Sequence, residues 1–195
     1  MVLLLVSALC TLAPSRPVAD SLAELHSGGR TWAEFFDAAK ARKEMWRDNF
    51  ERGTPDSALV SRVTALGGTW RILAVAEDWC GDSANTVPYL ARLAELAPNL
   101  ELRIVDSKKG RWVMEQHRTS DGRAATPTIL LLDSTYREMG AFVERPAKLR
   151  EWVAENKPKL GEDDFQSQKM KWYREDRGYH TVLDLVELLE AAAKR

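Results

Sequence analysis

Cys80 is the residue in this sequence best suited to covalent chemistry. The chain has two cysteines, Cys10 and Cys80, which is too few for a disulfide framework. Cys80 lies between the apolar run 70–76 and a stretch with helical spacing that begins at Ser83. A thiolate is the nucleophile of cysteine chemistry, and the free N–H groups at the start of a helix favour it. The sequence therefore predicts an accessible, reactive thiol at Cys80.

The neighbours of Cys80 suit this chemistry. Ser83 brings a backbone N–H and a hydroxyl that can both donate hydrogen bonds to a sulfur. Gly81 lets the backbone turn and lets a partner approach. We expect Trp79 to shield one side of the sulfur.

Acidic side chains surround the same position. Glu77 and Asp78 precede Cys80 and Asp82 follows it, and negative charges near a sulfur disfavour its thiolate. A helix start contributes about 0.3–1 kcal/mol at an exposed site, and solvated like charges contribute a similar amount in the opposite direction. We expect the helix start to prevail by a small margin. Asp82 and Ser83 are also expected to cap this helix.

Three features of the chain resemble the thioredoxin family. Pro88 lies where thioredoxins carry a proline inside the helix, and the segment 126–128 (Thr-Pro-Thr), directly before an apolar run, resembles their cis-proline segment. The resemblance covers about residues 69–155. The feature nearest the thiol resembles the W-C-G-x-C motif, with Ser in place of the second Cys, and is formed by Trp79, Cys80, Gly81, Asp82 and Ser83.

The resemblance implies a role for each of these residues. A cis bond between Thr126 and Pro127 would expose the backbone of Thr126 to pair with a substrate chain, and Pro127 would lie against Cys80. Cys80 and Ser83 are the implied catalytic residues. The implied substrate-binding residues are Trp79, Gly81, Asp82, Thr126 and Pro127.

Two departures from the family pattern limit the chemistry. Ser83 cannot attack a sulfur, so the ordinary dithiol cycle is closed to Cys80 alone. Ala74 stands where thioredoxins usually carry a buried Asp, so the internal proton relay is missing. Cys10 is an alternative resolving thiol, although it is distant in sequence. We expect an external thiol of low molecular weight to complete the reaction.

The apolar pattern indicates the elements that position these residues. Helices alternate with strands, except for one short turn at 134–136, which implies an antiparallel hairpin. The order βαβαββα fits an α/β thioredoxin fold with a central four-stranded mixed sheet. Strands are predicted at 70–76, 100–105, 128–133 and 137–143, with helices at 83–97, 110–117 and 146–156 and a terminal helix within 162–195.

The residues before this unit form a separate region. Residues 14–30 are rich in Pro, Ser, Gly and Ala and predict a linker. Thr31 caps a helix that ends at Gly53, and a second helix follows over 55–66. The predicted parts are an N-terminal apolar segment and linker (1–30), a helical extension (31–68) and a thioredoxin-like domain with a C-terminal helical addition (69–195).

The composition excludes several classes of function. A net charge of −1 gives no basic footprint for nucleic acid. No metal and no cofactor is predicted, because His26, His117 and His180 lack ligand spacing and no phosphate loop is present. The apolar stretch 2–13 is too short to span a membrane. Since no Lys or Arg precedes it, we expect a cytoplasmic protein, with export as the alternative.

Three functions follow from these residues. The first is a thiol–disulfide oxidoreductase that acts through Cys80 on protein disulfides, or on mixed disulfides with small thiols, with a small thiol as co-substrate. The second is a non-catalytic binding or scaffold module that recognises an extended peptide or a protein partner, which the missing second Cys and missing Asp favour. The third is a thiol peroxidase that oxidises Cys80 to a sulfenic acid, with Arg123 supplying a positive charge.

Overall fold

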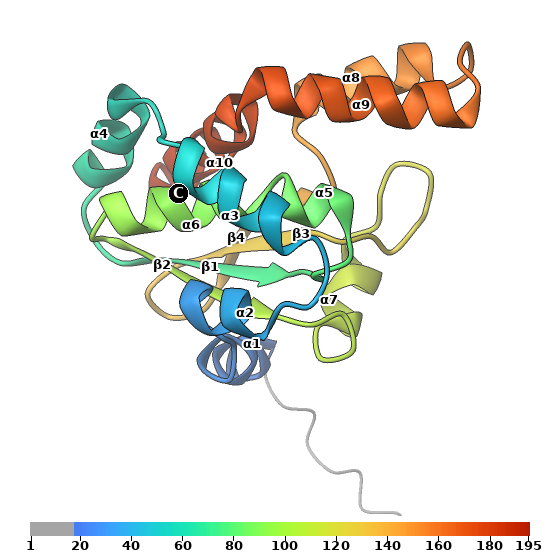
Figure 1. The fold of residues 1–195 in the computed structure, drawn as a ribbon. Coiled ribbons are helices and arrows are strands. Elements are labelled where there is room, and N and C mark those ends of the chain that lie inside the picture. Colours follow the sequence, from blue (N-terminus) through green and yellow to red (C-terminus); the bar gives the residue numbers. More distant parts are fainter. Residues whose placement is uncertain (1–17) are drawn as a thin grey trace, which may run out of the picture.

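A mixed sheet lies at the centre of the computed structural model, which describes residues 18–195 (Figure 1). Its four strands lie in the order β2-β1-β3-β4. β1 pairs parallel with β2, and β3 pairs antiparallel with both β1 and β4. This arrangement confirms the predicted α/β fold. The strands are β1 (Trp70–Val75), β2 (Leu100–Val105), β3 (Thr128–Leu132) and β4 (Glu138–Val143).

Helices cover both faces of this sheet (Figure 1). Within the described residues they are α1 (Val18–Ser27), α2 (Trp32–Ala38), α3 (Lys43–Arg52), α4 (Ser57–Ala65), α5 (Gly81–Ala84), α6 (Val87–Leu96), α7 (Arg111–Gln116), α8 (Ala147–Asn156), α9 (Glu162–Asp176) and α10 (Tyr179–Ala193). Helices α3, α4, α6 and α10 lie on one face, and α1 and α7 lie on the other (Figure 1).

Alternation along β1 divides the core between these two faces. Side chains of a strand point alternately to opposite sides. Ile72 and Ala74 join the larger cluster with α3, α4, α6 and α10, whereas Leu73 and Val75 join the smaller one with α1 and α7. The strand is therefore buried on both faces, which explains its continuous apolar run.

The prediction of one helix from Thr31 to Gly53 is wrong, because residues 39–42 are not helical and separate α2 from α3. The chain leaves the helix at Ala39, which is extended, and Arg42 has a left-handed φ of 51°. The N–H groups of Lys40 and Ala41 donate to the carboxylate of Asp78, at 2.7 and 3.1 Å. A distant acidic side chain therefore replaces the helical acceptors at this break.

The helix predicted over 83–97 is also two helices, α5 and α6. Thr86 caps α6 and Pro88 lies in its first turn, where the missing N–H of a proline costs no helical hydrogen bond. Pro88 therefore starts a helix here and does not kink one. The helix that starts at Cys80 is therefore the single turn α5 and not a long helix.

Two further segments differ from the sequence-based expectation. Part of the predicted linker 14–30 is helix α1, which buries Leu22 and His26 against the sheet. The terminal segment 162–195 contains two helices, because Arg177 and Gly178 both adopt left-handed conformations that end α9. Cys10 and the apolar stretch 2–13 lie outside the described residues.

The helix predicted over 55–66 begins slightly later. Asp56 caps α4 through the N–H of Ala58, at 2.8 Å, so Pro55 precedes the cap. Across residues 18–195, no helix is both long enough and apolar enough to cross a membrane.

Candidate active site

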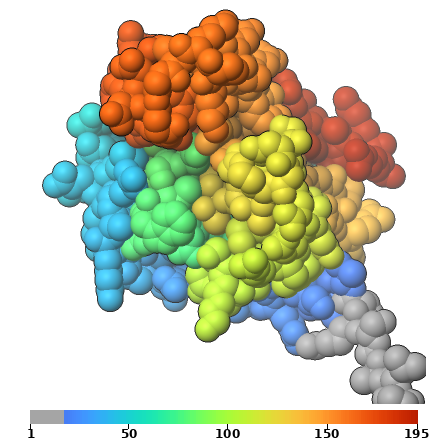
Figure 2. Space-filling view, turned by 90° about the vertical axis from the view of Figure 1, so that its right-hand side faces the viewer, coloured from blue at the N-terminus to red at the C-terminus, as the bar shows by residue number. Residues whose placement is uncertain are grey.

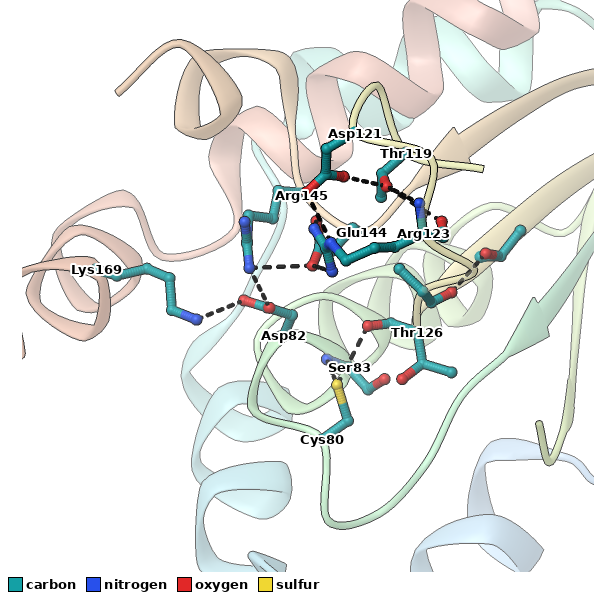
Figure 3. A network of polar contacts seen from close by, with 12 residues as sticks. Cys80, Asp82, Ser83, Thr119, Asp121, Arg123, Thr126, Glu144, Arg145 and Lys169 are labelled. Atoms are coloured by element: carbon teal, nitrogen blue, oxygen red, sulfur yellow. Dashed lines mark hydrogen bonds and ion pairs between the residues drawn. The ribbon is translucent and has the colours of Figure 1, made fainter. Parts of the chain in front are cut away.

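The sulfur of Cys80 lies between two segments that are far apart in sequence (Figure 3). Cys80 is the residue that caps α5, directly after the loop that follows β1. Its thiol donates a hydrogen bond to the carbonyl oxygen of Thr126 at 3.2 Å and accepts one from the backbone N–H of Ser83 at 3.4 Å. The residue is half-buried. The thiol is thus placed between one backbone acceptor and one backbone donor.

The segment at 126–127 faces this sulfur. The peptide bond between Thr126 and Pro127 is cis. The carbonyl of Pro127 accepts the N–H of Glu144 at 2.8 Å, and the hydroxyl of Thr128 donates to Ala125 at 2.7 Å. Among residues 18–195, the N–H of Thr126 has no hydrogen-bond partner. Thr126 therefore has a free backbone donor next to the sulfur.

The break between α2 and α3 holds the loop before Cys80. In addition to the two N–H groups that bind Asp78, the indole Nε1 of Trp46 donates to the Asp78 carbonyl at 2.9 Å, and the guanidinium Nε of Arg42 donates to the Trp79 carbonyl at 2.7 Å. The hydrogen bond from the Lys40 N–H lowers the pKa of Asp78. The Trp79 side chain is 61% exposed. It projects to solvent from a fixed backbone.

The acids near Cys80 bind other groups. The carboxylate of Glu77 accepts the N–H of Ser107 at 2.7 Å, and that of Asp78 binds the backbone of the α2–α3 break. The carboxylate of Asp82 points toward Arg145 and Lys169 (Figure 3). None of these three carboxylates therefore points at the sulfur as its hydrogen-bond partner.

Asp82 forms a buried cluster with partners from the other end of the chain. Its side chain accepts hydrogen bonds from Arg145 and from the Tyr173 hydroxyl, both at 2.9 Å, and lies 3.4 Å from the Lys169 ammonium. The residue is only 8% exposed. Burial alone would raise the pKa of Asp82, but the hydrogen bond and charge of Arg145, followed by Lys169, lower it.

This cluster shows where the Asp82 carboxylate points and contains residues that the sequence pattern did not indicate. Asp82 was expected to contact substrate, but its carboxylate is turned into the protein. Arg145, Lys169 and Tyr173 lie 63 to 91 residues from Asp82 in the chain, so no local spacing could have paired them. Tyr173 is buried.

Ser83 contributes its backbone and not its hydroxyl. The side chain is fully buried, and its hydroxyl has no hydrogen-bond partner in residues 18–195. The predicted hydrogen bond from this hydroxyl to the sulfur is absent from the structure, because the Ser83 N–H occupies that position. Gly81 is not in a left-handed conformation, and a Cβ there would meet the guanidinium carbon of Arg42 at an ordinary 3.9 Å. The backbone of Gly81 therefore does not itself require a glycine.

The site opens on one end of the molecule. In Figure 2 the segment around Cys80 (green) is flanked by α3 (light blue), by the α8–α9 hairpin (orange) and by the chain at 105–125 (yellow-green to yellow). Arg123 lies on the last of these segments, but its guanidinium is paired with Asp121 and Glu144, at 2.8 and 3.1 Å. It is therefore not a free cation for the sulfur, which removes the argument for a peroxidase.

The histidines lie apart from the thiol. Burial lowers the pKa of His26 to about 4, and its ring packs edge-on against Tyr136. His117 contacts Glu138 at 3.2 Å, and His180 contacts Asp176. No cluster of three or more His, Cys, Asp or Glu side chains that could hold a metal ion occurs in the described part of the chain.

Comparison with known proteins adds to this geometry. A thioredoxin family model matches residues 29–159, which include α2, α3 and α4 as well as the sheet. No curated protein matches the sequence.

Two solved structures resemble the chain over most of its length. A protein of unknown function from Pseudomonas aeruginosa is 25% identical, with a TM-score of 0.68, over 87% of this chain and 97% of its own. An HIV epitope-scaffold is 24% identical, with a TM-score of 0.68, over 86% of this chain and 96% of its own. The second likeness bears on the fold alone.

Proposed function

Since the chain belongs to the thioredoxin family, we propose that it is a thiol–disulfide oxidoreductase that acts through one cysteine, Cys80. The observation that carries this proposal is the position of the Cys80 sulfur. It is half-buried, lies beside the Ser83 N–H, and faces the backbone of Thr126. A thiol in this place has a donor to stabilise its thiolate and a neighbouring segment that can hold a substrate chain.

The proposed substrate is a mixed disulfide between a protein and a small thiol. The Cys80 thiolate attacks the sulfur of the small thiol, the original S–S bond breaks, and the protein thiolate leaves and takes up a proton. A second small thiol loses its proton and attacks the sulfur now bound to Cys80. The Cys80 thiolate is released together with a small-molecule disulfide. The protein sulfur is reduced to a thiol and the second small thiol is oxidised, while the sulfur of the first small thiol stays at the disulfide level.

The other site residues have supporting roles in this scheme. The Ser83 N–H stabilises the Cys80 thiolate before attack and again when it leaves. Thr126 pairs its free N–H with the substrate backbone, and Pro127 presents that edge to the sulfur. Trp79 provides an exposed apolar surface for the substrate. Gly81 leaves space for the incoming sulfur.

The absence of a thiol at position 83 is the reason for an external co-substrate. No second cysteine lies within residues 18–195, so within this part of the chain Cys80 has no resolving partner. We place the protein in the cytoplasm, where small thiols are kept reduced and can serve as this co-substrate.

The test is the reduction of a mixed disulfide between a model peptide and glutathione, with excess reduced glutathione. We expect Cys80→Ser to abolish the enzyme-dependent rate. Ser83→Ala is the matched control and should keep most of the rate, because it retains the backbone N–H that binds the sulfur. Equal rates for the natural chain and Cys80→Ser would end the proposal.

A second candidate is a binding module that uses the same face without chemistry. The free N–H of Thr126 and the exposed Trp79 support it, because both can recognise an extended chain. Capture experiments with Cys80→Ala under reducing conditions separate the two functions. A partner that stays bound to Cys80→Ala, but is lost from Trp79→Ala, would favour the binding module.

A further inference from the structure

We propose that the buried cluster of Asp82, Arg145, Lys169 and Tyr173 sets the reactivity of Cys80. Through Lys169 and Tyr173, helix α9 therefore contributes to the active site. The inference rests on the proposed role of Cys80 as the reactive thiol, and it adds positioning residues that act through Asp82.

The position of Asp82 in α5 makes this coupling direct. Asp82 lies between Cys80, which caps α5, and Ser83, whose N–H binds the sulfur. The Asp82 carboxylate is held from two sides, by Arg145 after β4 and by Lys169 and Tyr173 on α9. These contacts fix the single turn that carries the Ser83 N–H.

The same cluster reaches the opposite side of the sulfur. The carboxylate of Glu144 lies 3.1 Å from Arg145 and 3.1 Å from Arg123, and the Glu144 N–H donates to Pro127 at 2.8 Å. Arg145 therefore connects the turn that carries Ser83 to the segment that carries Thr126 (Figure 3). Arg145 is thus linked to both hydrogen-bond partners of the sulfur, to Ser83 through Asp82 and to Thr126 through Glu144 and Pro127.

Charged groups from several neighbouring elements contribute to the electrostatic potential at the Cys80 sulfur. Asp82 faces two cations directly, Arg145 and Lys169, and one hydroxyl donor, Tyr173. Glu144 offsets part of the Arg145 charge, and Arg123 offsets part of the Glu144 charge. The guanidinium of Arg42 lies over Gly81, while Glu77 and Asp78 are bound to backbone N–H groups elsewhere.

The positive charges of Arg145 and Lys169 thus compensate the negative charge of the Asp82 carboxylate beside the thiol. Charges interact more strongly in a partly buried site than in water. Removing a cation would leave the Asp82 carboxylate to disfavour the thiolate. Removing the carboxylate would leave two cations that favour the thiolate. A purely structural cluster would not give shifts of opposite sign.

The experiment follows alkylation of Cys80 by iodoacetamide as a function of pH in the full chain, with the modified peptide identified by mass spectrometry. We expect Asp82→Asn to move the midpoint of this profile to lower pH, and Lys169→Met to move it to higher pH. Each shift should be about 0.5 to 1 pH unit. The control is Lys171→Met, an exposed lysine on the same helix, which should leave the midpoint unchanged.

A milder pair of variants covers the case in which Lys169→Met does not fold. Tyr173→Phe removes one donor from Asp82 and should raise the midpoint, whereas Tyr89→Phe removes a part-buried hydrogen bond to Asn49 and should not. Midpoints that stay fixed, or that move in one direction for Asp82→Asn and Lys169→Met alike, would overturn the inference. Alkylation needs no disulfide substrate, so a failure of the proposed reductase activity would be seen separately.

Discussion

At the scale of single residues, position 83 decides what Cys80 can do. The Ser83 side chain is fully buried and its hydroxyl has no partner in residues 18–195, while its N–H binds the sulfur. The side chain therefore occupies the place of a second cysteine without that residue's chemistry. The sequence motif singled out this position, but it could not show that the Ser83 hydroxyl makes no hydrogen bond to the sulfur.

Ser83→Cys should restore a dithiol site. The new thiol replaces a buried hydroxyl of similar shape, three residues after Cys80 on a single turn of helix. We expect mild oxidation to form an intramolecular disulfide and reduction to proceed without an external small thiol. Thiol counting before and after oxidation measures the first effect. Oxidised Ser83→Cys should keep one free thiol, that of Cys10. The double variant Cys80→Ser with Ser83→Cys should not form the bond, and three free thiols in oxidised Ser83→Cys would contradict the prediction.

At the scale of elements, the sequence predicted strands better than helix breaks. β1 and β3 are largely buried apolar runs between turns, and such runs are visible in sequence. The breaks at 39–42 and 85–86 depend on distant groups or on a cap, because Asp78 binds Lys40 from 38 residues away. Helix α1 was missed since the Pro- and Gly-rich residues around it hide a short amphipathic segment.

Asp78 is expected to stabilise the contact between the α2–α3 break and the site loop in a pH-dependent way. Its carboxylate accepts two backbone N–H groups, and charge-assisted hydrogen bonds of this kind contribute about 1–3 kcal/mol. The hydrogen bond from Lys40 lowers the pKa of folded Asp78. The contribution should therefore be present above the unfolded value near pH 4 and be lost as the pH falls through the folded one.

Urea unfolding of Asp78→Asn at pH 7 and at pH 3 measures this contribution. The variant should be less stable than the natural chain at pH 7, and the difference should shrink at pH 3. Asp37→Asn, an exposed acid on the neighbouring helix α2, should change stability little at either pH. A difference that is equal at both pH values would show that the Asp78 charge is not involved.

At the scale of the whole molecule, the C-terminal residues belong to the core. Helix α10 packs against β4, α4, α6 and α8, and it buries Leu185, Val186 and Leu189 in the larger cluster. The Arg62 guanidinium on α4 forms two hydrogen bonds with the Glu190 carboxylate, at 2.7 and 2.8 Å. The sequence predicted a packed terminal helix from its spacing. It could not predict that α9 reaches Asp82.

Leu189→Ala should lower the free energy of unfolding by about 2–5 kcal/mol, because Leu189 is fully buried and its removal leaves a cavity. Chemical denaturation measures the loss. Glu187→Ala, an exposed site on the same helix, should change stability by less than about 0.5 kcal/mol. Equal free energies of unfolding for the two variants would show that α10 does not contribute to the stability of the core.

The exposed indole of Trp79 gives the site an optical signal of its own. The chain has seven tryptophans, all within the described residues. Trp79 alone among them is exposed to solvent over most of its surface, and Trp46 is completely buried. Acrylamide should therefore quench the emission of Trp79 preferentially. A molecule that settles over Cys80 would protect this fluorescence, so occupancy of the site can be titrated without any label.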